Sequence, residues 1–286
     1  MAAEVGLTVN MNQAQSIDFA NQFGLQVGNL VKLLGVQRKI ALSAGSTIKT
    51  YTSSVTLNGA AVPKGDIIPL SEVALEDGVP ISLVWDKKRK AVAVEDVQTY
   101  GFEQAIDRTD NALLRELQKG LRTTLIAQIA AGTGTATGEG LQAALANGWG
   151  KVQTAFEDDE VSTIGFVNTM DVANYLGTAQ ITVQTAFGLS YVENFLGMNI
   201  VVITPSVAAG TFYVTASDNL ILAYANVAGG DISRAFDFVT DATGIIGVTH
   251  DIDKQRLTAE TITLSGVVLF AERLDGVVVG TITVAV

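Results

Sequence analysis

The chain has 286 residues, of which 48% are hydrophobic and only 16% charged, with a net charge of −11. This length allows one elaborated domain or two modest ones, and the high apolar content favours burial of surface against further copies of the chain. Because there is no cysteine, disulfides, thiolate catalysis, iron–sulfur clusters and Cys-zinc sites are excluded.

The negative charge is concentrated in the middle of the chain. Residues 1–122 carry 13 basic and 13 acidic side chains, whereas residues 123–233 carry Lys151 against nine acids, a net charge of −8. Nucleic-acid binding needs clustered cations, so any attraction for nucleic acid comes from the first third. No apolar run approaches the roughly 18 residues of a membrane span, and residues 1–4 lack the features of a signal peptide. We therefore expect a protein that is made and used without export and that has no membrane partner.

The first 45 residues are interpreted as an arm. Apolar side chains recur at helical spacing between Ile17 and Leu34, but the flanks are rich in Asn and Gln and poor in strong caps. This pattern predicts a helix that forms by lying against something else. An ordinary N-terminal helix on its own domain fits the periodicity equally well.

Residues 46–78 predict a long hairpin. Strands near 48–57 and 67–75 are joined through turns at Asn58-Gly59 and Lys64-Gly65-Asp66, and Pro69 restricts the second strand to an edge or a two-stranded ribbon. A hairpin with so little apolar face is not stable alone in water. It must pack on its own domain or reach over a neighbour.

A second hairpin with a basic tip is expected next, from residues 79–85 and 91–94. Its turn contains Lys87, Lys88, Arg89 and Lys90. These cations could meet DNA or an acidic patch on a neighbour, but turns are often charged simply because they are solvated.

Residues 102–131 predict a helix about 45 Å long, ended by Gly132. Its broad apolar face comprises Ile106, Leu113, Leu114, Leu117, Leu121, Thr124 and Leu125. A narrow cationic stripe opposite comprises Arg108, Arg115, Lys119 and Arg122. The apolar face must be buried, whereas a solvated surface is the simpler interpretation of the stripe taken alone.

The glycine-rich run at residues 132–140 follows a helix and lacks the Lys-Ser/Thr of a phosphate loop, so it is interpreted as a flexible joint. A mixed module follows. It is expected to contain a helix near 141–156, a strand near 164–167, a helix begun by a capping box of Asn168 and Asp171, and strands near 200–204, 212–215 and 220–224.

Two catalytic or metal interpretations of the module find little support. The acidic residues 157–160 lack the alternating ligands and central glycine of a calcium loop, which favours a solvated turn. The module has neither His nor Cys and no recognisable nucleophile elbow. His250, the only histidine, is expected at the surface, and the partners of a triad or zinc site are not evident.

The tail predicts strands at residues 247–252, 260–270 and 277–286. Strands on both sides of the module suggest that the first third and the tail form one discontinuous domain, with residues 141 to about 240 inserted.

In this order the parts resemble the major capsid protein of tailed bacteriophages, an α+β fold called Hong Kong 97-like. The resemblance covers nearly the whole chain. Its most specific stretches are SIDFANQFGLQVGNLVKLLGVQRKIALSAGSTIKTY from Ser16, the stretch from Lys87 through the long helix, and FLGMNIVVITPSVAAGTFYVTASDNLILAYAN from Phe195. It implies an N-terminal arm at 1–45, an E-loop hairpin at 46–78, a peripheral domain at 79–137 and 241–286 that contains the spine helix, and an axial domain at 138–240.

The resemblance also implies a function. The chain would be a shell subunit without a catalytic site, metal or cofactor, which forms hexamers and pentamers and encloses the double-stranded DNA genome of a tailed phage in an icosahedral shell. Arms and E-loops would lie over neighbouring subunits. Packaged DNA held without sequence specificity, a separate scaffolding protein and a portal would be the other partners. The protein would be located in the virion, after assembly in the host bacterial cytoplasm.

Candidate site residues follow from that fold. The basic residues expected to face DNA or an adjacent subunit are Arg108, Arg115, Lys119, Arg122, Lys87, Lys88, Arg89 and Lys90. The expected hairpin-tip contacts are Asn58, Lys64 and Asp66. Lys64 is the only candidate donor for a Lys–Asn crosslink, which we do not expect without a matching acid and Asn. An encapsulin-type compartment that carries enzymes is the alternative within the same fold, and an α/β hydrolase-like enzyme is a remote one.

Overall fold

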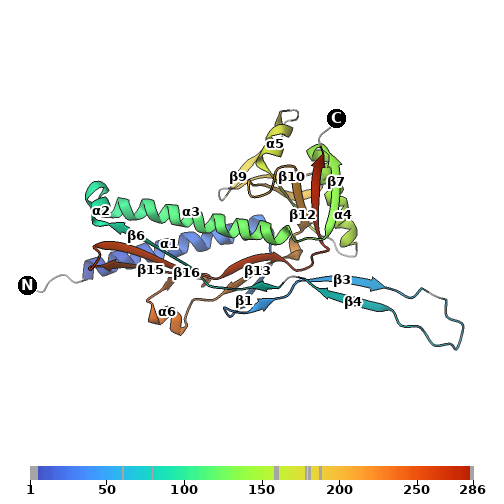
Figure 1. The fold of residues 1–286 in the computed structure, drawn as a ribbon, viewed down its shortest axis with the longest axis horizontal. Coiled ribbons are helices and arrows are strands. Elements are labelled where there is room, and N and C mark those ends of the chain that lie inside the picture. The colour runs from blue at the N-terminus through green and yellow to red at the C-terminus, as the bar shows by residue number, and fades with distance from the viewer. Residues whose placement is uncertain are drawn as a thin grey trace, which may run out of the picture.

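The computed structural model describes residues 6–283 apart from 60, 79, 158–160, 178, 180–181 and 187–188. Figure 1 shows two long helices side by side, a sheet module beyond one end of them, and a two-stranded hairpin that projects from the rest. The mixture of helices and strands confirms the α+β prediction.

The spine helix, α3 (Phe102–Ile129), forms as predicted and ends two residues before the expected position, 131. Its apolar face is buried, although Leu113 and Thr124 are only partly so. Gly132 lies beyond the helix end, and a Cβ at this position would lie 2.6 Å from Val277. Glycine is therefore needed for a close approach to a neighbouring strand. The buried residues of α3 are Ala105, Ile106, Leu114, Leu117, Leu121, Leu125, Ile126 and Ile129.

The N-terminal segment is not an arm without a core. Helix α1 (Gly6–Leu33) buries Phe19, Phe23 and Val27 in the same core that contains Leu117 of α3. The helix was predicted correctly, and of the two interpretations left open the ordinary helix on its own domain is confirmed, because the apolar face of α1 packs within its own chain. After α1, strand β1 (Arg38–Leu42) runs parallel to β13 (Leu220–Ala225).

The basic segment is a strand rather than a turn. Strand β6 (Asp86–Ala93) pairs along its whole length with β16 (Thr258–Ser265), at the edge of a four-stranded sheet ordered β14-β15-β16-β6. The predicted second hairpin is therefore wrong. Within residues 80–85, directly before β6, the only strand is the short β5 (Ile81–Ser82), which pairs with β2 (Thr47–Ile48). The other strands are β14 (Val239–Thr240) and β15 (Ile246–Asp253).

The strand predicted at residues 260–270 is divided between two sheets. Strand β16 ends at Ser265, and β17 (Val267–Ala271) begins after Gly266 and pairs with β13. The result is a three-stranded sheet, β1-β13-β17, that links the N-terminal segment, the module and the tail.

The module is built on a seven-stranded sheet ordered β7-β18-β12-β8-β11-β10-β9. The glycine-rich run is not a flexible joint, because β7 (Gly134–Glu139) pairs in parallel with β18 (Val277–Thr283). Strand β18 of the tail belongs to the seven-stranded sheet of the module, whereas β13, which lies within residues 138–240, belongs to the three-stranded sheet. The sheets therefore do not follow the domain boundaries proposed at 138 and 240. The remaining strands are β8 (Thr163–Val167), β9 (Gln184–Ala186), β10 (Leu189–Phe195), β11 (Met198–Ile203) and β12 (Thr211–Ala216).

The module's helices begin near the predicted positions. They are α4 (Gly140–Ala155) and α5 (Thr169–Leu176). Asn168 caps α5 by accepting a hydrogen bond from Met170 N at 2.7 Å, but Asp171 accepts from Gly210 N at 2.8 Å. The cap is confirmed, and Asp171 links α5 to the loop before β12 instead of completing a capping box. Beyond Glu157, the acidic cluster lies outside the described residues. The short helices are α2 (Val94–Tyr100), η1 (Ser217–Asn219) and α6 (Asp231–Ala235).

The hairpin of β3 (Tyr51–Thr56) and β4 (Glu72–Asp77) is antiparallel and shorter than predicted. Pro69 lies in the long tip between the strands and not within β4. A turn is present near Lys64, where Asp66 N donates to Pro63 O at 3.1 Å. The turn expected at Asn58-Gly59 extends to residue 60, which lies outside the described residues.

Candidate assembly and nucleic-acid surfaces

The hairpin carries large apolar side chains that its own chain does not cover. Ile67 and Leu70 at the tip are 91% and 95% exposed. Figure 1 shows the hairpin extending away from the sheets and helices, so none of these described elements shields it. The exposed apolar residues of this hairpin are Val55, Leu57, Ile67, Ile68, Leu70, Val73 and Leu75.

The candidate polar contacts of the hairpin lie at the same tip. Lys64 and Asp66 are exposed on the turn, and Asn58 N donates to Ser71 Oγ at 3.2 Å. Lys64 and Asp66 therefore lie on the turn of the apolar tip, whereas Asn58 lies where the loop leaves β3.

The cations of β6 point in two opposite directions, because neighbouring residues of a strand face opposite sides of a sheet. Lys90 faces α3, while Lys87 and Arg89 lie on the other face. Arg89 forms an ion pair with Glu260, and Lys88 pairs with Asp86 at 2.7 Å. These four residues therefore do not form a single basic patch.

Lys90 belongs to a polar row that crosses the sheet beneath α3. His250, Thr261 and Lys90 are direct neighbours on β15, β16 and β6, and all three reach Asp110 of α3. Lys90 Nζ lies 2.8 Å from Asp110 Oδ1, Thr261 Oγ1 donates to the same oxygen at 3.0 Å, and His250 Nε2 lies 3.0 Å from Oδ2. The Lys90 and Asp110 side chains are only 14% and 13% exposed. The row therefore pins the spine helix to the sheet.

Burial and hydrogen bonding oppose each other in this row. Burial raises the pKa of Asp110, but hydrogen bonds and charges from His250 and Lys90 outweigh it, and the net pKa is lowered. Burial also lowers the pKa of Lys90, and Asp110 offsets only part of that effect. Asp110 accepts from Thr261 as well as facing Lys90 and His250, whereas the other acceptors of Lys90 Nζ, Ile106 O and the Thr109 hydroxyl, are uncharged. The carboxylate is therefore the well-compensated partner.

His250 is buried and not at the surface as expected, with a side chain only 3% exposed. Its Nδ1 lies 2.8 Å from the Ser16 hydroxyl of α1, so Ser16, His250 and Asp110 are aligned in the order of a catalytic triad. The partners thought to be missing are present. No sequence motif signals them, because they come from three distant segments.

This alignment is poorly suited to nucleophilic catalysis. The Ser16 side chain is buried, its hydroxyl also lies 2.9 Å from Asn12 O, and it accepts a hydrogen bond from His250 N at 3.1 Å. A nucleophile must reach its substrate with a free lone pair, whereas this oxygen is occupied. Ser16 instead ties α1 to β15.

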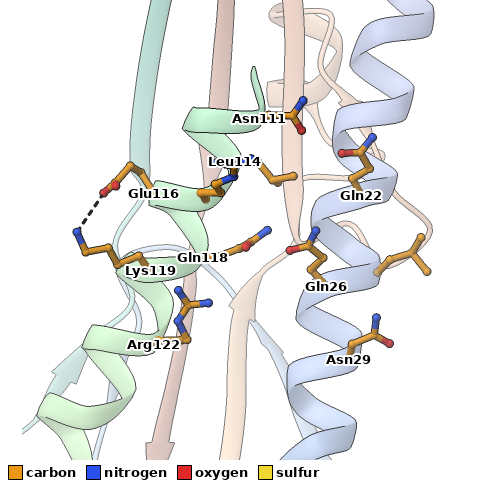
Figure 2. Close-up of a pocket in the computed structure, with 11 residues that line it drawn as sticks. Gln22, Gln26, Asn29, Asn111, Leu114, Glu116, Gln118, Lys119 and Arg122 are labelled. Carbon is orange, nitrogen blue, oxygen red and sulfur yellow. Dashed lines mark ion pairs between the residues drawn. The ribbon is translucent and has the colours of Figure 1, made fainter. Parts of the chain in front are cut away.

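The cations of the spine helix have different surroundings. Arg108 lies over the ring of Tyr100, 5.6 Å from its centroid, and Lys119 is 3.8 Å from Glu116, with both side chains largely exposed. Arg115 and Arg122 line a groove of about 820 Å³ between α1 and α3 and form no ion pair with any described residue. Figure 2 shows Arg122 on α3 beside Gln118, whereas Lys119 is turned toward Glu116 on the side of α3 away from α1.

In the part of the chain that the structure describes, no helix is long and apolar enough to cross a membrane. The same residues contain no group of three or more His, Asp or Glu side chains placed to hold a metal ion.

Neither the family models nor the curated proteins that were searched contain a match to this sequence. Solved structures do match. A capsid subunit of cyanophage A-1(L) is 12% identical, with a TM-score of 0.55 over 87% of this chain and 90% of that one. A subunit of the mature capsid of bacteriophage PhiM1 is 11% identical, with a TM-score of 0.51 over 86% and 85%. The chain has the Hong Kong 97-like capsid fold.

The capsid fold is also similar to that of a virus-like particle from Pyrococcus furiosus, which is 11% identical with a TM-score of 0.51 over 90% of this chain and 97% of that one.

Within the fold, sequence reasoning missed the polar row. No local signal marked it, because residues 87–90 are all cationic and show no alternation of apolar and polar side chains.

Proposed function

We propose that this chain is the major capsid protein of a tailed phage, which assembles through hexamers and pentamers into the icosahedral shell around a double-stranded DNA genome. The observation that carries the proposal is a hairpin with a fully exposed apolar tip on a chain with a capsid fold. The proposed parts are an E-loop at residues 46–78, a spine helix in a peripheral domain, and an axial domain built on the seven-stranded sheet.

The hairpin supports assembly because its apolar surface has no partner in the single chain. Exposed apolar side chains gathered on a projecting element are unfavourable in water and typical of a protein interface. Burying them against a neighbouring subunit would give the hairpin the core that it lacks. The N-terminal helix has no such need, since it is already packed.

We further propose that the exposed candidate cations that lie outside the groove between α1 and α3 and have no carboxylate partner meet the packaged DNA. Among the described residues Arg108 and Lys87 are exposed and form no ion pair, whereas Lys88, Arg89, Lys90 and Lys119 each pair with an acid. Contact with phosphate would then be weak and non-specific. A separate scaffolding protein and a portal belong to the same proposal, as do location in the virion and assembly in the bacterial cytoplasm.

A protein compartment of the encapsulin type is the second candidate. It is favoured by the net charge of −11, because a shell that holds enzymes needs no phosphate contacts. The similarity to the virus-like particle is in line with either function.

The two candidates are separated by the contents of particles purified from the natural source. After nuclease treatment of intact particles, we expect protected double-stranded DNA inside them. Finding a protein cargo and no DNA would favour the compartment. Finding that the purified chain stays monomeric, alone and with co-expressed neighbouring gene products, would contradict both.

A further inference from the structure

The groove between α1 and α3, here called the interhelical groove, is polar on both sides. Figure 2 shows Gln22 and Gln26 of α1 on the side of the spine helix, Gln118 of α3 pointing between the helices, and Asn29 one turn further along α1. The groove has a volume of about 820 Å³ and is lined by Gln22, Leu25, Gln26, Asn29, Asn111, Leu114, Arg115, Glu116, Gln118, Lys119 and Arg122.

The interhelical groove contains hydrogen-bond donors that have no acceptor. Arg122 is half-buried without a carboxylate partner, and burial lowers its pKa. Gln118 Nε2 is buried and has no hydrogen-bond partner among the described residues. Such groups destabilise a folded chain unless something satisfies them. Both would be satisfied by an acceptor that enters the groove.

The charge of the groove selects an anion. Its lining contains three cations, Arg115, Lys119 and Arg122, against Glu116 alone. The exposed pair of Lys119 and Glu116 is weak at 3.8 Å, and the α1 side contributes only amides and Leu25. Guanidinium groups bind carboxylates through two parallel hydrogen bonds, so Arg115 and Arg122 are suited to acidic side chains.

The spacing of the polar groups favours a peptide as the ligand of the groove. Gln22, Gln26 and Asn29 recur at helical spacing along one flank of α1, over about 10 Å of helix, and Arg115 and Arg122 are separated by the same length of α3. Amides can both donate to and accept from a peptide backbone. Packed helices lie only about 8–10 Å apart. A DNA duplex is too broad to reach the floor between them, whereas one peptide segment can lie along it.

We propose that the interhelical groove binds an acidic peptide segment of a partner protein, with Arg115 and Arg122 holding its carboxylates and the amides of α1 and Gln118 holding its backbone. The proposal does not depend on the contents of the shell. It assigns the two arginines to a protein partner and leaves Arg108 and Lys87 as the candidate contacts for DNA.

The test is fluorescence anisotropy with a labelled glutamate-rich peptide, a lysine-rich peptide of the same length and a labelled DNA duplex, on both assembled and unassembled protein. Of these three probes, we expect only the glutamate-rich peptide to bind in the groove. The double variant Arg115→Gln/Arg122→Gln should weaken that binding roughly tenfold or more. The matched control, Arg108→Gln/Lys87→Gln, removes the same charge outside the groove and should change it less than about threefold.

A second variant separates binding from folding. Gln118→Leu removes the buried donor that has no partner, so the free protein should melt at a higher temperature while its affinity for the glutamate-rich peptide falls. Equal losses in both double variants would mean general charge attraction and would overturn the proposal. So would binding of the duplex in place of the peptide, or no binding of the peptide to protein in either state.

Discussion

Helix α1 and the hairpin of β3 and β4 differ in how their apolar side chains are shielded from water. Both segments lie at the margin of the molecule and both carry large apolar side chains. Phe19 and Phe23 of α1 are buried against α3, whereas Ile67 and Leu70 of the hairpin are almost fully exposed. One segment completes its core within the chain, and the other requires a second molecule.

The difference follows from the geometry of the two segments. The apolar residues of α1 recur at helical spacing and form one stripe, which can lie along the matching stripe of the spine helix. The tip of the hairpin has Ile67, Ile68 and Leu70 close together without strand pairing, so they cannot form one face over a sheet of their own chain. A regular stripe predicts an intramolecular partner, and an irregular apolar tip predicts an intermolecular one.

The largest effect is expected when the shared core of α1 and α3 receives a charge. Leu117→Asp places a carboxylate at a buried position of the spine helix, and burial of an unpaired charge is prohibitive. We expect no soluble protein, measured as yield after expression. Ala112→Asp, at an exposed position of the same helix, should be recovered normally. A wild-type yield of the Leu117 variant would refute the assigned face.

The comparison is tested directly by removing one ring from α1. Phe23→Ala should lower the free energy of unfolding by about 3–5 kcal/mol, as is typical for buried aromatic residues. Chemical denaturation of the unassembled protein measures it. Leu25→Ala, two residues away and 67% exposed, should stay within about 0.5 kcal/mol of wild type. Equal, small effects would mean that α1 is a free arm after all.

The polar row holds α3 on the sheet in addition to the apolar contacts. It therefore adds a second kind of contact within the chain that the exposed hairpin lacks. Asp110→Asn should cost about 3 kcal/mol at neutral pH, since Lys90 then lies buried without a carboxylate. Glu103→Gln, at an exposed position of the same helix, is the matched control. Urea denaturation at a series of pH values measures both variants.

The pH dependence of that difference has a definite sign. The pKa of Asp110 is lowered in the folded state from its ordinary 3.8 by Lys90 and His250. The stabilisation is therefore present above 3.8 and is lost as the pH falls through the lower folded value. The gap between wild type and the Asp110 variant should shrink under acid conditions. A gap that is constant down to the most acidic pH would show that the charge of Asp110 contributes nothing.

The smallest effect on the single chain is expected at the hairpin tip. Replacing Ile67, Ile68 and Leu70 by Ser should change the free energy of unfolding by no more than about 0.5 kcal/mol, because these side chains are exposed. Assembly should be lost, as light scattering and electron microscopy would show. The control variant is Val84→Ser, at a position that is 64% exposed and lies away from the hairpin. This variant should still assemble. Normal shells from the tip variant would contradict its role in the interface.

Periodicity was sufficient to predict the spine helix, α4 and most strands of the module, because each has a regular apolar pattern of its own. It failed where long-range pairing decided the structure. The glycine-rich run became a strand only because β18 returns beside it, and the basic segment only because β16 pairs with it. In the candidate site, the spine cations were found from the helical wheel, whereas the triad-like alignment of Ser16, Asp110 and His250 was not, since no local pattern joins them.

The most direct test is a cryo-electron microscopy map of particles assembled from this chain. We predict that each hairpin tip is buried against a neighbouring subunit, while α1 stays against the spine helix of its own chain. A map in which the tip remains in solvent, or in which α1 crosses to another subunit, would contradict the account.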